Sequence, residues 1–210
     1  MSTTRIRNIA ITCIRTASDP QITPYVELSG KQLKNRLNPK DALVILESLN
    51  VLRFALESGV KLVSVLVDAR HLERLLEQLP QLGEGDVPIY YAQREVLSAI
   101  AGIDVTRGYL ACAKRPHPLG MDELLSLARR IVVLEGLTDV SNVGAIFRSC
   151  VALGADGIVL SPECADPLNR RAIRVSMGTT LRFPWARAEG PWPKPFFAAL
   201  RRRDFRTVAL

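Results

Sequence analysis

The chain alternates between short, continuous apolar runs and longer segments in which apolar residues recur at helical spacing. The continuous runs predict buried strands, because a strand covered on both faces loses the polar alternation of a half-exposed one. These runs are residues 9–14, 42–46, 61–68, 87–92, 107–113, 131–135 and 157–160. Segments with helical spacing are residues 47–59, 71–82, 93–102, 121–130 and 143–153. Alternating strands and helices predict an α/β fold class.

The clearest local unit spans residues 134–160, where a turn, a helix and a second strand follow a first strand through very short connections. Asn142 or Ser141 is placed to cap this helix, and Gly154 to end it. Arg148 lies off the apolar face, beside Gly144, where small side chains leave room for a large partner to approach the backbone. The commoner alternative is a simple cap followed by a solvated arginine, and this segment alone favours that alternative.

The balance of charge favours a polyanionic partner. Lys and Arg number 28 against 21 Asp and Glu, a net charge of +7, and basic side chains release counterions from a phosphate backbone. The basic residues gather in residues 31–40 and 170–203. Trp185 and Trp192 lie near the second group and could either stack on unpaired bases or cover an edge of the core. Covering the core edge is the commoner role of tryptophan. Many proteins of similar charge never bind nucleic acid.

A helix is predicted to begin at Pro167, directly after Asp166. It places Arg170 and Arg174 four residues apart on one face, which suits a phosphate. The alternative, equally supported, is a solvated helix with an Asp166 to Arg170 ion pair that contributes only a few tenths of a kcal/mol.

Several protein classes are excluded by composition and spacing. No apolar run approaches the ~20 residues of a membrane helix, so we expect no membrane partner. The four cysteines are widely spread, which predicts reduced thiols and no metal site. The first eighteen residues lack acidic groups, as in a transit peptide, but residues 9–14 read better as a strand, and we expect a cytoplasmic protein. A nucleotide-binding oxidoreductase is disfavoured, because the turn after Glu135 lacks G-x-G-x-x-G.

From residue 142 onward the chain resembles the start of the catalytic domain of SpoU (TrmH-type) RNA 2′-O-ribose methyltransferases of the SPOUT superfamily. The residues that carry the resemblance are Asn142, Gly144, Arg148, Gly154, Asp166, Pro167, Arg174, Ser176 and Gly178. The resemblance implies transfer of a methyl group from S-adenosylmethionine to a ribose 2′-hydroxyl of rRNA or tRNA. It also implies an α/β domain with a parallel sheet, whose C-terminal part is tied into a trefoil knot.

The same resemblance implies roles for particular residues. Arg148 and Asn142 are the implied catalytic residues: the arginine orients the hydroxyl or its adjacent phosphate, and the asparagine shapes the loop that leads into the site. Arg170, Arg174 and Ser176 are the implied RNA-binding residues, the last two as either RNA or structural contacts. No residue is assigned to the cofactor, and no side chain stands out as a general base.

Two family segments, a Gly-Glu-Gly loop and a Ser-Leu-Asn loop, are expected downstream and are not found there; the only Gly-Glu-Gly is residues 83–85. Residues 205–210 read as an apolar strand. We therefore expect an incomplete form that lacks the knot-forming C-terminal part and has little affinity for S-adenosylmethionine by itself. A homodimer of the complete protein is implied by the family.

These observations predict four segments. Residues 1–42 form an N-terminal extension, 43–113 an RNA substrate-binding α/β sandwich, 114–127 a linker, and 128–210 an incomplete SpoU methyltransferase domain. The sandwich resembles the family's substrate-binding domain, related in fold to RNA-binding ribosomal proteins, through its element order and Glu47, Arg53 and Gly108. Family members often have glycine where this chain has Ser48. The alternative function is a noncatalytic RNA-binding or assembly protein.

Overall fold

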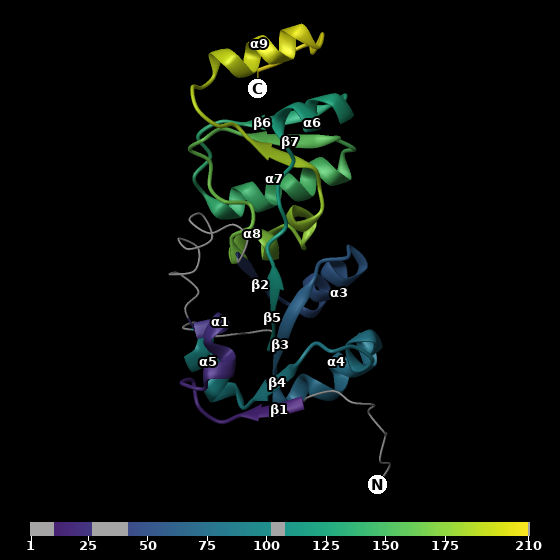
Figure 1. Ribbon diagram of the computed structural model, residues 1–210, viewed down its shortest axis with the longest axis vertical. Helices are drawn as coiled ribbons and strands as arrows, with labels where there is room; N and C mark the ends of the chain where they lie inside the picture. The colour runs from purple at the N-terminus through teal and green to yellow at the C-terminus, as the bar shows by residue number, and fades with distance from the viewer. Residues whose placement is uncertain (1–10, 27–41, 102–107, 210) are drawn as a thin grey trace. The chain divides into compact units, whose positions relative to one another are not determined.

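The computed structural model describes residues 11–26, 42–101 and 108–209 (Figure 1). The chain divides into two compact units, Met1–Arg115 and Pro116–Leu210, each with its own sheet. The predicted α/β class is confirmed for both units. Within the described ranges, no helix has the length and apolar character that crossing a membrane requires.

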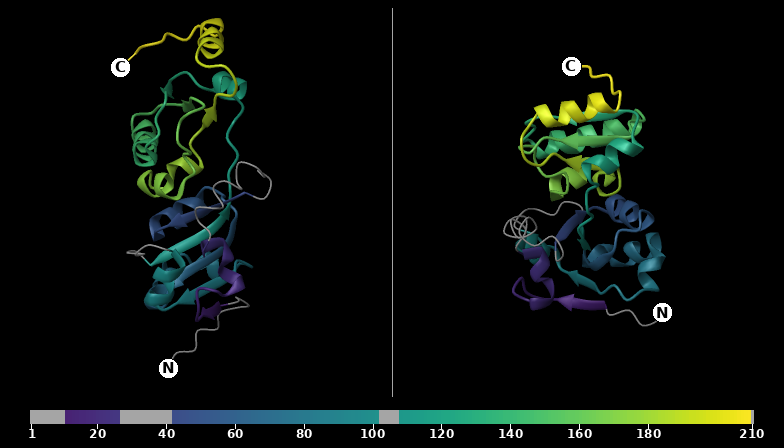
Figure 2. Two further views of the ribbon diagram at one scale, coloured as in Figure 1. Left: turned by 90° about the vertical axis from the view of Figure 1, so that its left-hand side faces the viewer. Right: turned by 45° about the horizontal axis from the view of Figure 1, so that its top comes forward.

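The first unit is built on a five-stranded mixed sheet in the order β1-β4-β3-β5-β2. The strands are β1 (Ile11–Ile14), β2 (Leu43–Glu47), β3 (Leu62–Asp68), β4 (Ile89–Ala92) and β5 (Tyr109–Lys114). The helices are α1 (Thr23–Val26), α3 (Leu49–Glu57), α4 (Leu72–Gln78) and α5 (Arg94–Ala101). Helices α1 and α5 lie on one face of the sheet, and α3 and α4 on the other (Figures 1 and 2). Each strand predicted for this unit is present, and α4 ends just before Pro80 as predicted.

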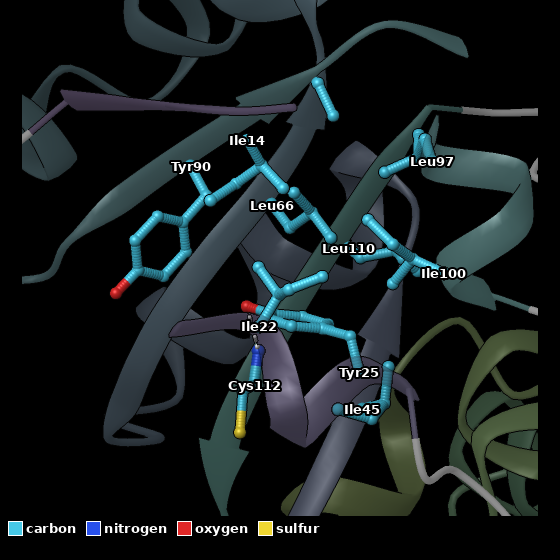
Figure 3. Packing of buried hydrophobic residues seen from close by; sticks show 11 residues of the cluster. Ile14, Ile22, Tyr25, Ile45, Leu66, Tyr90, Leu97, Ile100, Leu110 and Cys112 are labelled. Carbon is cyan, nitrogen blue, oxygen red and sulfur yellow. Dashed lines mark hydrogen bonds between the residues drawn. The ribbon is translucent and has the colours of Figure 1, made fainter. Parts of the chain in front are cut away.

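Residues 11–26, which belong to the segment 1–42 predicted as an N-terminal extension, take part in this unit. Strand β1 pairs in parallel with β4, with Ile11 opposite Ile89. Tyr25 is completely buried in the cluster under α1 and α5 (Figure 3). Its hydroxyl is hydrogen-bonded to Ser64 Oγ at 2.7 Å and accepts from the Cys112 N–H at 3.2 Å. The boundary predicted at residue 43 therefore falls between segments that share one sheet and one core. The sequence did not indicate this, because a short helix of mixed polarity gives no sign of burial.

Replacing Tyr25 with phenylalanine is expected to destabilise the first unit by about 1–3 kcal/mol, because the buried Cys112 N–H and the Ser64 hydroxyl lose their partner. Thermal unfolding followed by circular dichroism measures the change. The half-exposed Tyr91 provides the matched control, and Tyr91→Phe is expected to shift stability by less than about 0.5 kcal/mol. Equal effects of the two substitutions would contradict the assigned role of the Tyr25 hydroxyl.

Ser48, which the family resemblance set apart as a departure from a glycine, adopts a backbone conformation that favours glycine. Its φ is 95°, and it is buried at the N-terminus of α3, where its Oγ accepts from the Val51 N–H at 3.4 Å. A non-glycine residue at such an angle costs roughly 1–3 kcal/mol, whereas exchanging a serine cap for glycine loses only a few tenths.

We therefore expect Ser48→Gly to stabilise the first unit by about 0.5–1 kcal/mol, after allowing for the extra freedom that glycine gives the unfolded chain. Ser48→Ala should do the opposite, because it keeps the strained angle and removes the cap, at a cost of about 1 kcal/mol. Urea denaturation of the two variants measures the sign. A destabilising glycine would show that the serine hydroxyl outweighs the strain.

The second unit carries a parallel sheet, as predicted for this part of the chain, with three strands in the order β6-β7-β8; the third strand was not among those predicted. Its strands are β6 (Ile131–Leu134), β7 (Gly157–Leu160) and β8 (Trp185–Arg187). Its helices are α6 (Met121–Leu127), α7 (Val140–Ala152), α8 (Arg170–Val175) and α9 (Lys194–Arg202). Helices α6 and α9 cover one face, and α7 and α8 cover the other (Figures 1 and 2). The sheet is thus the middle of three layers.

Three expectations for this unit are corrected by the structure. Helix α6 lies within the predicted linker of residues 114–127, yet its Leu124 and Leu125 are buried in the core with Phe196 of α9. Helix α8 begins at Arg170 instead of Pro167, because Asp166 first accepts the Leu168 N–H in a turn. Residues 205–209, most of the stretch 205–210 predicted as an apolar strand, have no regular structure, since an apolar run forms a strand only where an adjacent edge offers hydrogen bonds.

Candidate functional site

The three parallel strands of the second unit end at one edge of their sheet, where ligand sites of open α/β sheets are usually built. The loops after β6 and β7 are hydrogen-bonded to each other there. The Gly136 N–H donates to Ser161 Oγ at 2.9 Å, and the Ala165 N–H donates to the Leu137 carbonyl at 2.8 Å. The Cys164 thiol donates to the carbonyl of Leu134 at 3.1 Å. These contacts fix the two loops as one platform.

Arg187, at the end of β8, holds the loop after β7 from the other side. Its Nη1 donates to the carbonyls of Ser161, Pro162 and Cys164 at 3.2, 3.1 and 2.7 Å. Its Nη2 donates to the Ala165 carbonyl at 3.0 Å. The sequence placed Arg187 only within the basic group of residues 170–203, which suits a polyanion. Its guanidinium instead satisfies backbone oxygens, a use that the sequence gave no means to foresee.

The tryptophans serve the core edge, the commoner of the two roles considered for them. Trp185 is buried on β8, with its ring edge-on to Phe147 at 6.5 Å between centroids. Trp192 stacks on Phe196 at 5.0 Å, and its Nε1 donates to Glu135 Oε1 at 2.7 Å. The loop after β8 is thereby joined to the loop after β6.

Asp139 caps helix α7, in place of the predicted Asn142 or Ser141. Its Oδ1 accepts from the Ser141 and Asn142 N–H groups at 2.6 and 3.0 Å. These two donors, Asn142 first, hold the pKa of the Asp139 carboxyl below its ordinary value. Because the pKa is depressed in the folded state, the cap contributes stability at neutral pH and loses it as the pH falls through that lowered pKa. Asn142 keeps its side chain exposed in the first turn.

Arg148 is exposed on α7, off the face that buries Val143, Phe147 and Cys150, as the helical spacing predicted. The space beside it has a different occupant from the one expected. Gly144 faces helix α8, and a Cβ built on Gly144 would lie 2.5 Å from the Ala172 carbonyl oxygen. The small residue therefore serves internal packing of α7 on α8, and the room predicted there for an external partner is taken by the protein itself.

Helix α8 carries the predicted Arg170 and Arg174, both half-buried, on its six residues. Asn169 caps it by accepting the Arg171 N–H at 2.9 Å. Arg171 is exposed, and its charge contributes to the lowered pKa of Asp139, after the backbone donors. Sequence reasoning missed Arg171 as a site residue, because only the packing of α8 on α7 brings it near that carboxylate.

Ser176 is completely buried. Its hydroxyl donates to the Ile173 carbonyl at 3.0 Å and accepts from the Thr180 N–H at 3.5 Å. Of the two roles considered for this residue, the structure supports the structural one and leaves no exposed atom for RNA.

The residues that carried the resemblance in the first unit have local structural roles. Glu47 is buried at the end of β2, and Arg53 Nη2 donates to Gln78 Oε1 at 2.7 Å. Gly108 has a φ of 67°, and a Cβ there would lie 2.6 Å from the His71 ring and 3.0 Å from Asp68 Cβ. Only glycine fits that position without displacing its neighbours.

Comparison with known proteins identifies the relatives of this chain. Residues 129–210 match the model of the SpoU rRNA Methylase family. A Mycobacterium bovis protein named as an uncharacterized tRNA/rRNA methyltransferase is 35% identical over 192 residues, 91% of this chain and 65% of that protein. The 23S rRNA (adenosine(1067)-2′-O)-methyltransferase of Streptomyces azureus is 26% identical, over 81% of this chain and 62% of its own length. The chain thus spans less than two thirds of the length of these relatives.

Solved structures agree on the fold. An rRNA methyltransferase from Sinorhizobium meliloti, also solved with AdoMet bound, superimposes with a TM-score of 0.68 at 23% identity, over 91% of this chain and 69% of its own. The SpoU methyltransferase AviRb from Streptomyces viridochromogenes gives 0.67 at 20% identity, over 88% and 66%. The resemblance to SpoU methyltransferases predicted from the sequence is confirmed.

Proposed function

We propose that this chain, whose residues 129–210 match the SpoU rRNA methylase family, is an RNA 2′-O-ribose methyltransferase. The observation that carries the proposal is the pair of helices α7 and α8, which begins at the loop edge of the parallel sheet. Asn142 and Arg148 are exposed on α7, and α8, packed against α7 through Gly144, adds the exposed cation of Arg171. The relatives, one named as a tRNA/rRNA methyltransferase and one as a 23S rRNA 2′-O-methyltransferase, support RNA as the substrate.

In this proposal Arg148 is the catalytic residue that contacts the substrate. A guanidinium presents a rigid fork of donors, which suits binding a ribose oxygen and its adjacent phosphate together. The fork orients the 2′-hydroxyl and stabilises the charge that develops as its proton is lost. Asn142 stands in the first turn, where Asp139 fixes the backbone, and shapes the loop that leads into the site. Arg170 and Arg174 are proposed as phosphate contacts from α8.

S-adenosylmethionine is the proposed methyl donor, since its sulfonium supplies an activated methyl group. The described edge loops do not form a ready site for it. The Ser161 hydroxyl accepts from Gly136, the Arg187 guanidinium binds carbonyls, and Glu135 accepts from Trp192. These polar groups are engaged with one another, so we assign no described residue to the cofactor and derive no step through it.

The remaining parts of the proposal concern partners. We propose that the first unit, a ribosomal-protein-like α/β sandwich, binds the substrate RNA, that the protein is a homodimer, and that it acts in the cytoplasm. Light scattering coupled to size-exclusion chromatography tests the dimer, and a mass of one chain at micromolar concentration would contradict it.

A methyl-transfer assay tests the function. The full-length gene product is incubated with isotope-labelled S-adenosylmethionine and unmodified bacterial rRNA or tRNA, and nucleosides are analysed for 2′-O-methylation. We expect label in a ribose-methylated nucleoside. Base methylation without ribose methylation would contradict the proposal. RNA binding without any transfer, while a known SpoU enzyme is active in parallel, would support the noncatalytic RNA-binding alternative instead.

A further inference from the structure

We propose that Arg187 is a positioning residue, which sets how helix α8 presents its arginines by holding the loop after β7. Its guanidinium fills a cage of four backbone carbonyls of residues 161–165, at 2.7–3.2 Å. This inference rests on the proposed function, because the face that it positions is the one proposed to bind RNA.

The cage requires a cation with several donors. Carbonyl oxygens gathered in one turn repel one another and need hydrogen-bond donors when water is displaced. The planar guanidinium offers five N–H groups in a fixed fork, and Arg187 uses both terminal nitrogens to contact the loop. A lysine ammonium is a single point on a shorter reach and cannot replace two nitrogens held apart by the guanidinium plane.

The loop is connected to α8 by only a few residues. After Ala165, Asp166 forms a turn in which its carboxylate accepts the Leu168 N–H at 2.9 Å and its carbonyl accepts the Asn169 N–H at 3.1 Å. Asn169 then caps α8 directly. A shift of the caged loop is therefore transmitted to the start of the helix.

The contact of α8 with α7 leaves the helix little freedom to absorb such a shift. Gly144 of α7 approaches the Ala172 carbonyl so closely that even a methyl group would overlap it. Helix α8 is thus held between a caged loop at its start and a close helix contact at its middle. With Arg187 removed, the loop keeps its hydrogen bonds to the loop after β6 but loses the donors to its four carbonyls, so the constraint at the start of α8 is weakened while its arginines stay on the chain.

Two variants and a control separate positioning from the other roles. Arg187→Met and Arg187→Lys are compared with Arg129→Met, an exposed arginine at the amino end of β6, the opposite edge of the sheet. RNA affinity is measured against salt concentration at a temperature where all variants are folded. The fluorescence of the two tryptophans, both in the second unit, verifies folding.

We expect both Arg187 variants to lose RNA affinity about tenfold or more, with the salt slope reduced by more than the roughly 0.7–0.9 that one phosphate contact contributes. Free guanidinium chloride at about 10 mM, well below denaturing concentrations, should raise the RNA affinity of Arg187→Met, whereas the same concentration of sodium chloride should not. Guanidinium should leave the RNA affinities of the wild type and of Arg129→Met unchanged. A different result would show that Arg187 contacts a phosphate directly and would overturn the proposal: Arg187→Lys keeps its RNA affinity, Arg187→Met loses it, and the salt slope changes by about one phosphate contact. Unchanged affinity in both variants would overturn it as well.

Hydrogen exchange tests the same proposal even if the chain binds no RNA. In Arg187→Met, amides of residues 161–171 should exchange about tenfold faster or more, while those of β7 stay protected. Equal protection of this segment in the variant would overturn the positioning role by itself. A wild type that binds no RNA, with the exchange result as expected, would instead refute the RNA-binding part of the proposed function.

Discussion

Replacing Arg148 with alanine is expected to lower the rate of RNA ribose methylation about 10²–10³-fold, the loss typical of removing one charge-stabilising donor from an active site. Because the side chain is exposed on α7, unfolding free energy should change by less than about 0.5 kcal/mol. The measurement is the single-turnover rate of label transfer to RNA under saturating donor.

Arg148→Lys should recover only part of the lost rate, since lysine restores the charge without the planar fork of donors. Arg202→Ala is the matched control, an exposed arginine on α9 whose removal should leave the rate unchanged. Should Arg148→Ala and Arg202→Ala behave alike, Arg148 has no catalytic role, and the exposed helix face would be reduced to a solvated surface.

The second large effect concerns Gly144. Gly144→Ala is expected to destabilise the second unit by about 1–3 kcal/mol, because its new methyl group would meet the Ala172 carbonyl oxygen at 2.5 Å. Backbone cannot move aside as a side chain does, so α7 and α8 must separate. Helix propensity acts in the other direction by about 1 kcal/mol, since alanine is favoured over glycine inside a helix. A stabilised variant would show that the helices part without cost.

Urea denaturation followed by tryptophan fluorescence measures this change in the second unit. Gly120→Ala is the matched control in the same unit, because a Cβ there has no neighbour within 4 Å. Because Gly120 is the N-cap of α6 and alanine is a poorer cap, its unfolding free energy should fall by less than about 1 kcal/mol. Since Gly144 also brings α8 beside α7, we expect Gly144→Ala to weaken RNA binding at temperatures where the unit is still folded.

Much of the second unit was predictable because its signals are local. Continuous apolar runs marked β6 and β7, and helical spacing placed Arg148 on the exposed side of α7. Both patterns depend only on which side chains avoid water within one element. Of the strand predicted at residues 205–210, the described residues 205–209 form none, because a strand also needs a partner that its own residues do not specify.

The cap of α7 shows where local reasoning stops. Asp139, Ser141 and Asn142 are all capable caps. The choice among them depends on where the loop after β6 turns into the helix. That point is fixed by the Gly136 and Leu137 contacts to the loop after β7, some 25 residues further along the chain.

By itself, the sequence determined the class of fold, the parallel order of strand, helix and strand in the second unit, and the family to which residues 129–210 are similar. Each of these follows from the periodicity of apolar residues or from the spacing of residues along the chain. Only the tertiary structure decided the use of Arg187, the reason for Gly144 and the burial of Ser176. An arginine, a glycine or a serine takes its role from the atoms that surround it, and those atoms come from elements distant in sequence that meet only when the chain is folded.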